Sequence, residues 1–322
     1  MPRALCAQLL ILTVLPALSG CILAGPVDMG NANAPPSRHV DWCGTLRLSD
    51  HTPQDVELGG LSDLAWQART DTLYLLSDRG WLFQARPRFE RGQLDELVIT
   101  ASHRLRDRDG RALEMPRADA ESMTLDTTET PATLLIGFER DHRLQRFSLT
   151  GQAVAAPMRP EALEGARYNG GVEAMTLTAR HGLMAGLEKP PRDSAARTTR
   201  LFNDRGQQWH YVLADEPASG LTAMAPLTVP GQPADEELLT LERAFDPPHP
   251  LVISLRRTRL NEDGSTSVTT LARLSSADGW RLDNFEGLTR IDAHRYLMVS
   301  DDNYSLLQST LLSCLDITVD GQ

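Results

Sequence analysis

VEAMTLTARHGLMAGLEK, residues 172–189, holds two short runs of β-forming residues separated by a turn, and each run carries an acid. The first run has Glu173 near its start, and the second ends at Glu188. Neither run shows the 3.6-residue spacing of apolar side chains that marks an amphipathic helix. The stretch therefore predicts two neighbouring β-strands with acids at one end of the pair.

The same phrase recurs through the chain in five copies. The first run of each copy reads GLSDLAW (60–66), AESMTL (120–125), VEAMTL (172–177), LTAMAPL (221–227) and FEGLTRI (285–291). The second runs are LYLLSDR (73–79), LLIGFER (134–140), LMAGLEK (183–189), LLTLERA (238–244) and YLMVSDD (296–302). Further β-like stretches follow at 144–149 and 153–158, at 199–202 and 209–213, and at 251–255 and 267–274. Four short strands per repeat are typical of a propeller blade. We expect an all-β propeller of five four-stranded blades, and longer segments between repeats leave room for a sixth.

The fifth copy contains only three candidate strands, at 287–291, 296–300 and 306–318. Its fourth strand is predicted to be residues 43–48, so that the two ends of the propeller pair and close the ring. This closure places Cys43 and Cys314 on neighbouring strands. In an oxidising compartment two such thiols form a disulfide, and the alternative is a pair of buried free thiols.

The amino-terminal residues carry a targeting signal. An apolar run at residues 9–18 precedes Leu18-Ser19-Gly20-Cys21, which resembles a bacterial lipobox. We expect 1–21 to be a lipoprotein signal peptide, Cys21 to be lipidated, 22–40 to be a flexible tether and 41–322 to be the propeller. An ordinary signal peptide is the alternative. The expected location is the periplasmic side of the cell envelope, with the outer membrane preferred because Ile22 gives no retention signal.

Composition narrows the class of partner. The chain has 322 residues, 41% hydrophobic and 23% charged, with 32 basic and 43 acidic residues and a formal charge of −11. That balance excludes wholesale disorder and a multi-span membrane protein. An acidic chain repels phosphate backbones, so we expect no nucleic-acid partner. The expected partners are a small phosphorylated or ester substrate and the membrane through its lipid anchor, and the expected state is a monomer.

Three columns of the repeat hold the candidate site residues. The ends of the second runs give Asp78, Glu139, Glu188, Glu242 and Asp301, and the next column gives Arg79, Arg140, Lys189, Arg243 and Asp302. The first runs give Ser62, Glu121, Glu173, Thr222 and Glu286. Since innermost propeller strands surround one axis, each column becomes a ring. Crowded oxygen ligands suit Ca²⁺ or Mg²⁺, and we expect Ca²⁺. The predicted ligands are Asp78, Glu121, Glu139, Glu173, Glu188, Glu242, Asp301 and Asn303. Salt bridges between blades are the alternative.

Several phrases together resemble one bacterial family. They are GLSxLA (60–65), LxxLSDRG (73–80), DAESM (119–123), NGGVEAM (169–175), NFEGL (284–288) and VSDDNY (299–304). Over roughly residues 55–315 the chain is similar to the family named "esterase-like activity of phytase". The resemblance implies a propeller with phosphoester or ester hydrolysis that calcium assists. Ser122, Ala174 and Thr222 depart from the family pattern, which argues against a fully symmetric site.

A reaction scheme follows from the columns. Ca²⁺ held by Asp301, Asp302, Glu286, Glu121 and Glu173 would polarise a phosphate and activate water. Arg79, Arg140 and Arg243 would neutralise developing charge. Since Gly-x-Ser-x-Gly and other nucleophile motifs are absent, a carboxylester hydrolase is disfavoured. A propeller that only binds a ligand or an envelope partner is the rival hypothesis.

Overall fold

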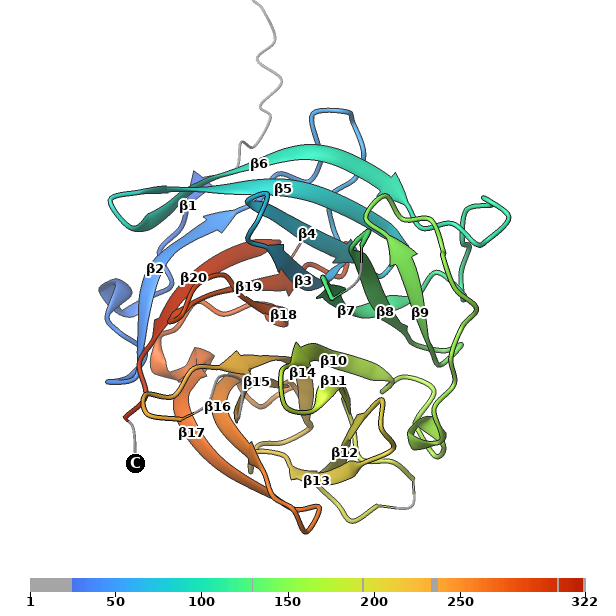
Figure 1. Cartoon of the computed structure of the whole chain (residues 1–322). Helices are drawn as coiled ribbons and strands as arrows, with labels where there is room; N and C mark the ends of the chain where they lie inside the picture. The colour runs from blue at the N-terminus through green and yellow to red at the C-terminus, as the bar shows by residue number, and fades with distance from the viewer. Residues whose placement is uncertain (1–24, 129, 193, 233–236, 306, 321–322) are drawn as a thin grey trace, which may run out of the picture.

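The computed structural model describes residues 25–128, 130–192, 194–232, 237–305 and 307–320. Five antiparallel sheets stand around a common centre (Figure 1). The predicted all-β, five-bladed propeller is confirmed, and no sixth sheet is found in these ranges. The predicted signal peptide and Cys21 lie outside the described residues. In the described part of the chain, no helix is long and apolar enough to cross a membrane.

The blades follow the chain in order. Blade 1 contains β3 (Leu61–Gln67), β4 (Thr72–Ser77), β5 (Trp81–Glu90) and β6 (Gln93–Arg104). Blade 2 contains β7 (Ala120–Asp126), β8 (Thr133–Phe138) and β9 (Arg143–Ser148). Blade 3 contains β10 (Val172–Thr178), β11 (Gly182–Leu187), β12 (Thr198–Asn203) and β13 (Gln208–Val212). Blade 4 contains β14 (Ser219–Leu227), β15 (Glu237–Ala244), β16 (Val252–Leu260) and β17 (Thr266–Ser275). Blade 5 contains β18 (Asn284–Arg290), β19 (Arg295–Asp301), β20 (Leu311–Ile317), β2 (Val40–Arg47) and β1 (Gly25–Pro26). Three short 3-10 turns complete the chain: η1 (Asn31–Asn33), η2 (Glu161–Leu163) and η3 (Ser276–Asp278).

The innermost strands form the closed ring that positions the site. Each of β3, β7, β10, β14 and β18 contacts the next, and β18 contacts β3. The buried carboxylate of Asp63 accepts hydrogen bonds from the amides of Leu64 (2.7 Å) and Met123 (2.6 Å), which joins blade 1 to blade 2. Gly287 is required beside it, since a Cβ there would lie 2.8 Å from the Cα of Asp63. Polar contacts between inner strands therefore hold adjacent blades at close range.

The two ends of the propeller meet in blade 5. β2 pairs antiparallel with β20, and a disulfide joins Cys43 to Cys314 with the Cα atoms 4.8 Å apart. Both predictions, the closing strand and the disulfide, are confirmed.

The start of the packed chain differs from the predicted tether. Within residues 22–40, β1 pairs with β2, and Met29 is 1% exposed in the core that blades 4 and 5 share. Residues 25–40 therefore lie against the propeller rather than serving as a free linker. The reason is that Val27 and Met29 pack against the core. These two apolar residues are easily overlooked in a segment otherwise rich in Gly, Asn and Pro.

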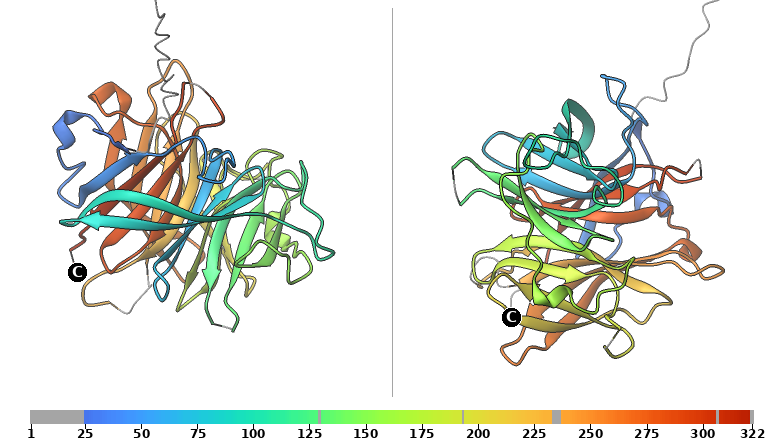
Figure 2. Two further views of the ribbon diagram at one scale, coloured as in Figure 1. Left: turned by 90° about the horizontal axis from the view of Figure 1, so that it is seen from above. Right: turned by 90° about the vertical axis from the view of Figure 1, so that its right-hand side faces the viewer.

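Blade 2 also differs from prediction, because the segment 153–158 forms no regular fourth strand. It joins β9 through the isolated bridges Phe147↔Ala153 and Leu144↔Met158 and through single hydrogen bonds from the amide of Val154 and the side chain of Gln145. Pro157 has no amide hydrogen to donate to a ladder, and Pro160 follows three residues later. In blade 1, by contrast, the fourth strand is long. β6 has 12 residues and extends to blade 5, where it contacts β2 and β20 (Figures 1 and 2).

Candidate functional site

A β-bulge interrupts every innermost strand at the same position of the repeat. The register shifts fall around the residues Ser62, Glu121, Glu173, Thr222 and Glu286. A bulge re-aims the side chain of its extra residue out of the normal alternation. In blades 2, 3 and 5 the re-aimed residue is a glutamate, and all three glutamates line one cavity. The sequence column is thereby explained by backbone geometry.

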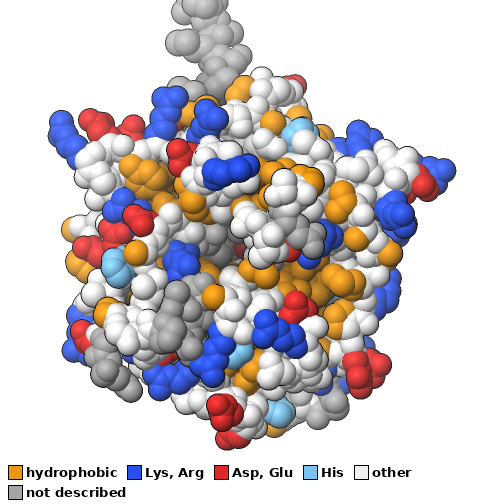
Figure 3. Space-filling view, in the orientation of Figure 1, with side chains coloured by type: hydrophobic (Ala, Val, Ile, Leu, Met, Phe, Trp, Pro, Cys, Tyr) orange, Lys and Arg blue, Asp and Glu red, His pale blue; other side chains and the backbone are white. Residues whose placement is uncertain are grey.

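This central cavity has a volume of about 250 Å³. Its lining is Asp78, Asp119, Glu121, Glu139, Arg140, Asn169, Glu173, Glu188, Lys189, Arg243, Glu286, Asp301 and Asn303. Eight of these side chains are carboxylates and three are cations, so the lining is acidic. Every predicted metal ligand except Glu242 lies here, as do the predicted catalytic residues Asp301, Glu286, Arg140 and Arg243. On the face viewed in Figure 3, by contrast, acidic and basic side chains are interspersed.

Some of the carboxylates have a cation of the protein as a partner. Arg140 pairs with Asp119 at 3.0 Å, and Lys189 pairs with Glu188 at 2.9 Å. The guanidinium of Arg243 lies 3.2 Å from Glu188 and 3.0 Å from Glu286. The three cations therefore pair with carboxylates of blades 2, 3 and 5.

Other carboxylates have no such partner. In the described ranges, the side-chain carboxylates of Glu121 and Glu173 make no hydrogen bond and no ion pair. Glu139 accepts hydrogen bonds from the amides of Gly170 and Gly171, the latter at 3.1 Å. Oxygen atoms of two triads lie within 4.8 Å of one another: Asp119, Glu121 and Glu139 form one, and Glu139, Glu173 and Glu188 form the other. Such buried acidic clusters have the composition of a metal site.

Burial is the main cause of unusual proton affinity in this cavity. It raises the pKa values of Glu121 and Glu173 well above their usual range, and neighbouring carboxylates raise them further. Burial also raises the pKa of Glu286 to about 7 against the lowering effect of Arg243, and that of Asp301 to about 8. The pKa of Asp78 rises to about 6. Like charges at this density repel, so the cavity holds protons at neutral pH unless a cation enters.

Glu242 is the one predicted ligand that the structure places elsewhere. In blade 3, Leu187 pairs across the sheet with Val172 and Glu188 follows it into the cavity. In blade 4 the residue paired in this way is Glu242, opposite Leu221, so Arg243 takes the ring position. Because successive strand residues face opposite sides, a shift of one residue sends the side chain to the other face.

The side chain of Glu242 has a structural role. It is 1% exposed, and it accepts hydrogen bonds from the hydroxyls of Tyr211 (2.6 Å) and Ser219 (2.8 Å) and from the amide of Ala214 (2.7 Å). Arg256 completes the set with an ion pair. The prediction that Glu242 faces the axis is therefore wrong.

Arg79 and Asp302 also lie outside the cavity lining. The guanidinium of Arg79 stacks 3.2 Å from the centre of the Tyr304 ring and pairs with Glu57 at 3.3 Å. The carboxylate of Asp302 accepts hydrogen bonds from the amides of Gly60 (2.9 Å) and Tyr304 (3.0 Å) and from the hydroxyl of Thr310 (3.0 Å). Both residues connect blade 5 to blade 1, so we assign neither of them a role in the reaction.

Sequence reasoning overlooked three residues of the lining as site residues. Asp119 stands two positions before Glu121, and the structure pairs it with Arg140. Asn169 precedes the two glycines whose amides hold Glu139. Lys189 was recognised as part of the basic column but given no role. The acid directly before the first run of the second copy was the available signal for Asp119, whereas nothing in the repeat marked Asn169.

The family model "Phytase-like: Esterase-like activity of phytase" matches residues 56–304. The chain belongs to this family. The resemblance expected from the sequence is thus confirmed, and a hydrolase-like propeller is the general class that it supports. No curated protein matches this phytase-like chain.

Solved structures similar to the phytase-like chain include two propellers. One is "Crystal structure of RRP9 WD40 repeats", with 8% identity, a TM-score of 0.43 and coverage of 88% of this chain and 99% of that one. The other is the propeller domain of Cps50 (Swd1) from Myceliophteria thermophila, with 10% identity, a TM-score of 0.40 and coverage of 92% and 100%. Likeness at this level carries no information about the site.

Proposed function

We propose that this chain is a divalent-cation-dependent phosphoester hydrolase whose reaction takes place in the central cavity. The observation that supports the proposal is the pair Glu121 and Glu173, two bulge carboxylates that face a shared cavity without any partner in the described residues. A buried charge without a counter-charge is costly, and a bound cation removes that cost.

The donor set fits Ca²⁺. The lining offers carboxylate and amide oxygens and, among the described residues, no histidine or cysteine. Oxygen-only ligands suit hard cations such as Ca²⁺, which accepts six to eight of them in flexible geometry. Glu121, Glu173 and Glu139 are the residues that would hold the ion, with Asp78, Asp301 and the amide of Asn303 within the same lining.

The protein's own cations define where a phosphate would bind. Lys189 and Arg140 keep 39% and 34% of their side-chain surface exposed, so both reach solvent at the cavity. Arg243 is more enclosed, at 20%, and pairs with both Glu188 and Glu286. Arg140 and Lys189 would orient the phosphate oxygens of a substrate and balance its charge. When bound, a divalent ion supplies Lewis-acid polarisation of the phosphate and a more acidic water.

The test is hydrolysis of phytate and of 4-nitrophenyl phosphate by the purified full chain, with CaCl₂ and with a chelator. We expect turnover that depends on the cation and falls by about a hundredfold or more in Glu173→Gln. Glu96→Gln, an exposed acid of blade 1 in a surface ion pair with Arg88, is the matched control and should keep full activity. Equal rates with chelator, or in Glu173→Gln, would reject the proposal.

A non-catalytic propeller that binds a ligand or a partner is the second candidate. The observation in its favour is that Arg243 already neutralises part of the ring from within, as a structural ion pair does. In that case Ca²⁺ would raise the melting temperature strongly while no phosphoester or ester is turned over.

We also propose that the protein is a monomeric lipoprotein of the cell envelope, anchored through Cys21 and facing the periplasm, with the outer membrane preferred. The support is the lipobox-like stretch Leu18-Ser19-Gly20-Cys21 after an apolar run, together with a disulfide suited to an oxidising compartment. Radiolabelled palmitate should be incorporated by the natural sequence and not by Cys21→Ser.

A further inference from the structure

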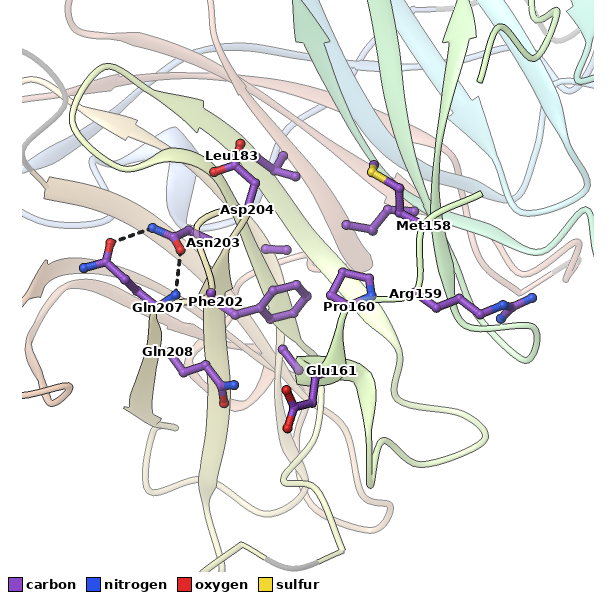
Figure 4. A pocket seen from close by; sticks show the side chains of 14 residues that line it. Met158, Arg159, Pro160, Glu161, Leu183, Phe202, Asn203, Asp204, Gln207 and Gln208 are labelled. Atoms are coloured by element: carbon purple, nitrogen blue, oxygen red, sulfur yellow. Dashed lines mark hydrogen bonds between the residues drawn. The ribbon is translucent and has the colours of Figure 1, made fainter. Parts of the chain in front are cut away.

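A second cavity, of about 410 Å³, lies between blades 2 and 3 and shares no residue with the central one. Its apolar wall consists of Leu144, Met158, Pro160, Ala162, Leu183, Ala185 and Phe202. Figure 4 shows the Phe202 ring facing Pro160, with Met158 and Leu183 beyond them. Concave, mostly apolar sites of this size hold small organic molecules.

The irregular edge of blade 2 gives rise to this cavity. Where the other blades have a regular fourth strand, the segment from Ala153 to Pro160 makes only two bridges to β9 and then turns into η2. The space beside β11 and β12 is therefore left partly open. Among the five sheets described, only that of blade 2 has three strands.

Polar contacts fix the walls on both sides, so the cavity is preformed. Arg200 of β12 donates to the carbonyl oxygens of Ala162 (2.7 Å) and Glu164 (3.1 Å), which holds η2 against blade 3. The side-chain amide of Gln145 donates to the carbonyl of Ala155 at 3.1 Å. A preformed site loses little conformational entropy when a ligand enters.

The charges on the rim are negative. Asp204 and Glu161 are exposed carboxylates on the lining, and neither has a hydrogen-bond or ion-pair partner in the part of the chain that the structure covers. Arg159 is the one cation of this lining, and it is already paired with Asp141 at 2.6 Å. Its guanidinium points away from the Phe202 ring in Figure 4. A ligand therefore meets an apolar wall between two free acids.

We propose that the cavity between blades 2 and 3 binds an organic cation: an ammonium group attached to a hydrocarbon or aromatic body. The apolar body packs on Phe202, Leu183 and Met158, and the ammonium group pairs with Asp204. A smaller cavity of about 270 Å³ adjoins it and shares Met158, Leu183 and Asp204, which gives a longer body room to extend.

Three matched probes test the proposal: 4-phenylbutylammonium, 4-phenylbutanol and 4-phenylbutanoate, each titrated calorimetrically into the purified full chain. We expect the cation to bind about tenfold more tightly than the alcohol, and the anion not to bind. Asp204→Asn should reduce the preference for the cation by about tenfold, while Asp95→Asn, an exposed acid of blade 1, should leave it unchanged.

A second variant tests the location. Met158 is 44% exposed, so Met158→Trp is tolerated at the surface, fills the cavity and should weaken all three probes. Met115→Trp, at a methionine 47% exposed on another loop, is its control. Equal binding of the three probes, wild-type affinity in both Asp204→Asn and Met158→Trp, or displacement of the cation by CaCl₂, which would place it in the central cavity, would each overturn the proposal.

Discussion

Blades 3 and 4 are built from the same phrase, yet they present opposite charges to the axis. At the ring position blade 3 has Glu188 and blade 4 has Arg243, and the two side chains lie 3.2 Å apart as an ion pair. The acid that blade 4 seemed to contribute, Glu242, is buried on the other face of its sheet. Each blade thus has an acid followed by a base, but Glu188 lines the cavity in blade 3 and Glu242 has a structural role in blade 4. Strand register decides which role the acid takes.

The largest expected effect is the loss of stability when Glu242, rather than Glu188, is replaced. Glu242→Leu leaves Arg256 buried without a counter-charge and removes one hydrogen-bond acceptor of Tyr211, so we expect a loss of about 3 to 5 kcal/mol in the free energy of unfolding. Glu188→Gln faces the open cavity and should cost far less. Urea denaturation measures both, and similar losses for the two variants would contradict the assignment.

The second effect is a dependence of stability on pH. In the central cavity the folded-state pKa values of Asp78, Glu286 and Asp301 are raised to about 6, 7 and 8. Raised carboxyl pKa values favour the folded state below the unfolded values of about 4, and this contribution is lost as pH rises through the folded values. Without Ca²⁺, stability should therefore fall between about pH 4 and pH 8.

The cation should reverse this loss. In thermal melts, the rise in melting temperature caused by CaCl₂ should be larger at about pH 8.5 than at about pH 5.5, because more carboxylates are then ionised. If Ca²⁺ gave the same rise at both pH values, the central carboxylates would not be its ligands.

A smaller effect, on Ca²⁺ affinity, should follow from removing the positive charge of Arg243 in blade 4. Arg243→Gln removes the positive charge that faces Glu188 and Glu286, so we expect Ca²⁺ affinity to increase by about tenfold. Arg79→Gln is the matched control, since Arg79 stacks on Tyr304 outside the lining and its loss should leave Ca²⁺ affinity unchanged. Calorimetric titration with Ca²⁺ compares the two.

The smallest effect is expected at the rim of blade 3. Lys189 is 39% exposed and pairs with Glu188 at 2.9 Å, and exposed pairs contribute at most about 1 kcal/mol. Lys189→Met should leave stability nearly unchanged and weaken inhibition by inorganic phosphate by about threefold. A large loss of stability would mean that Lys189 is a structural partner like Arg256.

The repeat allowed the fold and much of the site to be predicted. The column of Ser62, Glu121, Glu173, Thr222 and Glu286 was correct because a large apolar residue stands two positions after each member, and every copy has its bulge at the same place. The second column failed in blade 4 because Glu242 and Arg243 are both charged. Composition does not say which of two adjacent residues pairs with Leu221.

Other parts could not be read from the repeat. Arg79 contacts Tyr304 and Asp302 contacts Gly60 across the boundary between blades 1 and 5, and no local pattern links the members of either pair. The cavity between blades 2 and 3 depends on a strand that fails to form. Pro157 marked that failure, but the resulting space depends on how η2 docks on β12.

The disulfide in blade 5 also has a mechanical consequence. A pull on the amino-terminal side of Gly25 would first peel β1 from β2 and would then reach Cys43. There the tension passes covalently to Cys314, 271 residues along the chain, and bypasses the blades between them. An oxidised ring can thus carry a load at its amino-terminal end without unwinding, whereas in a reduced ring the load would fall on the hydrogen bonds between β2 and β20 and on the packing of β2 in the core.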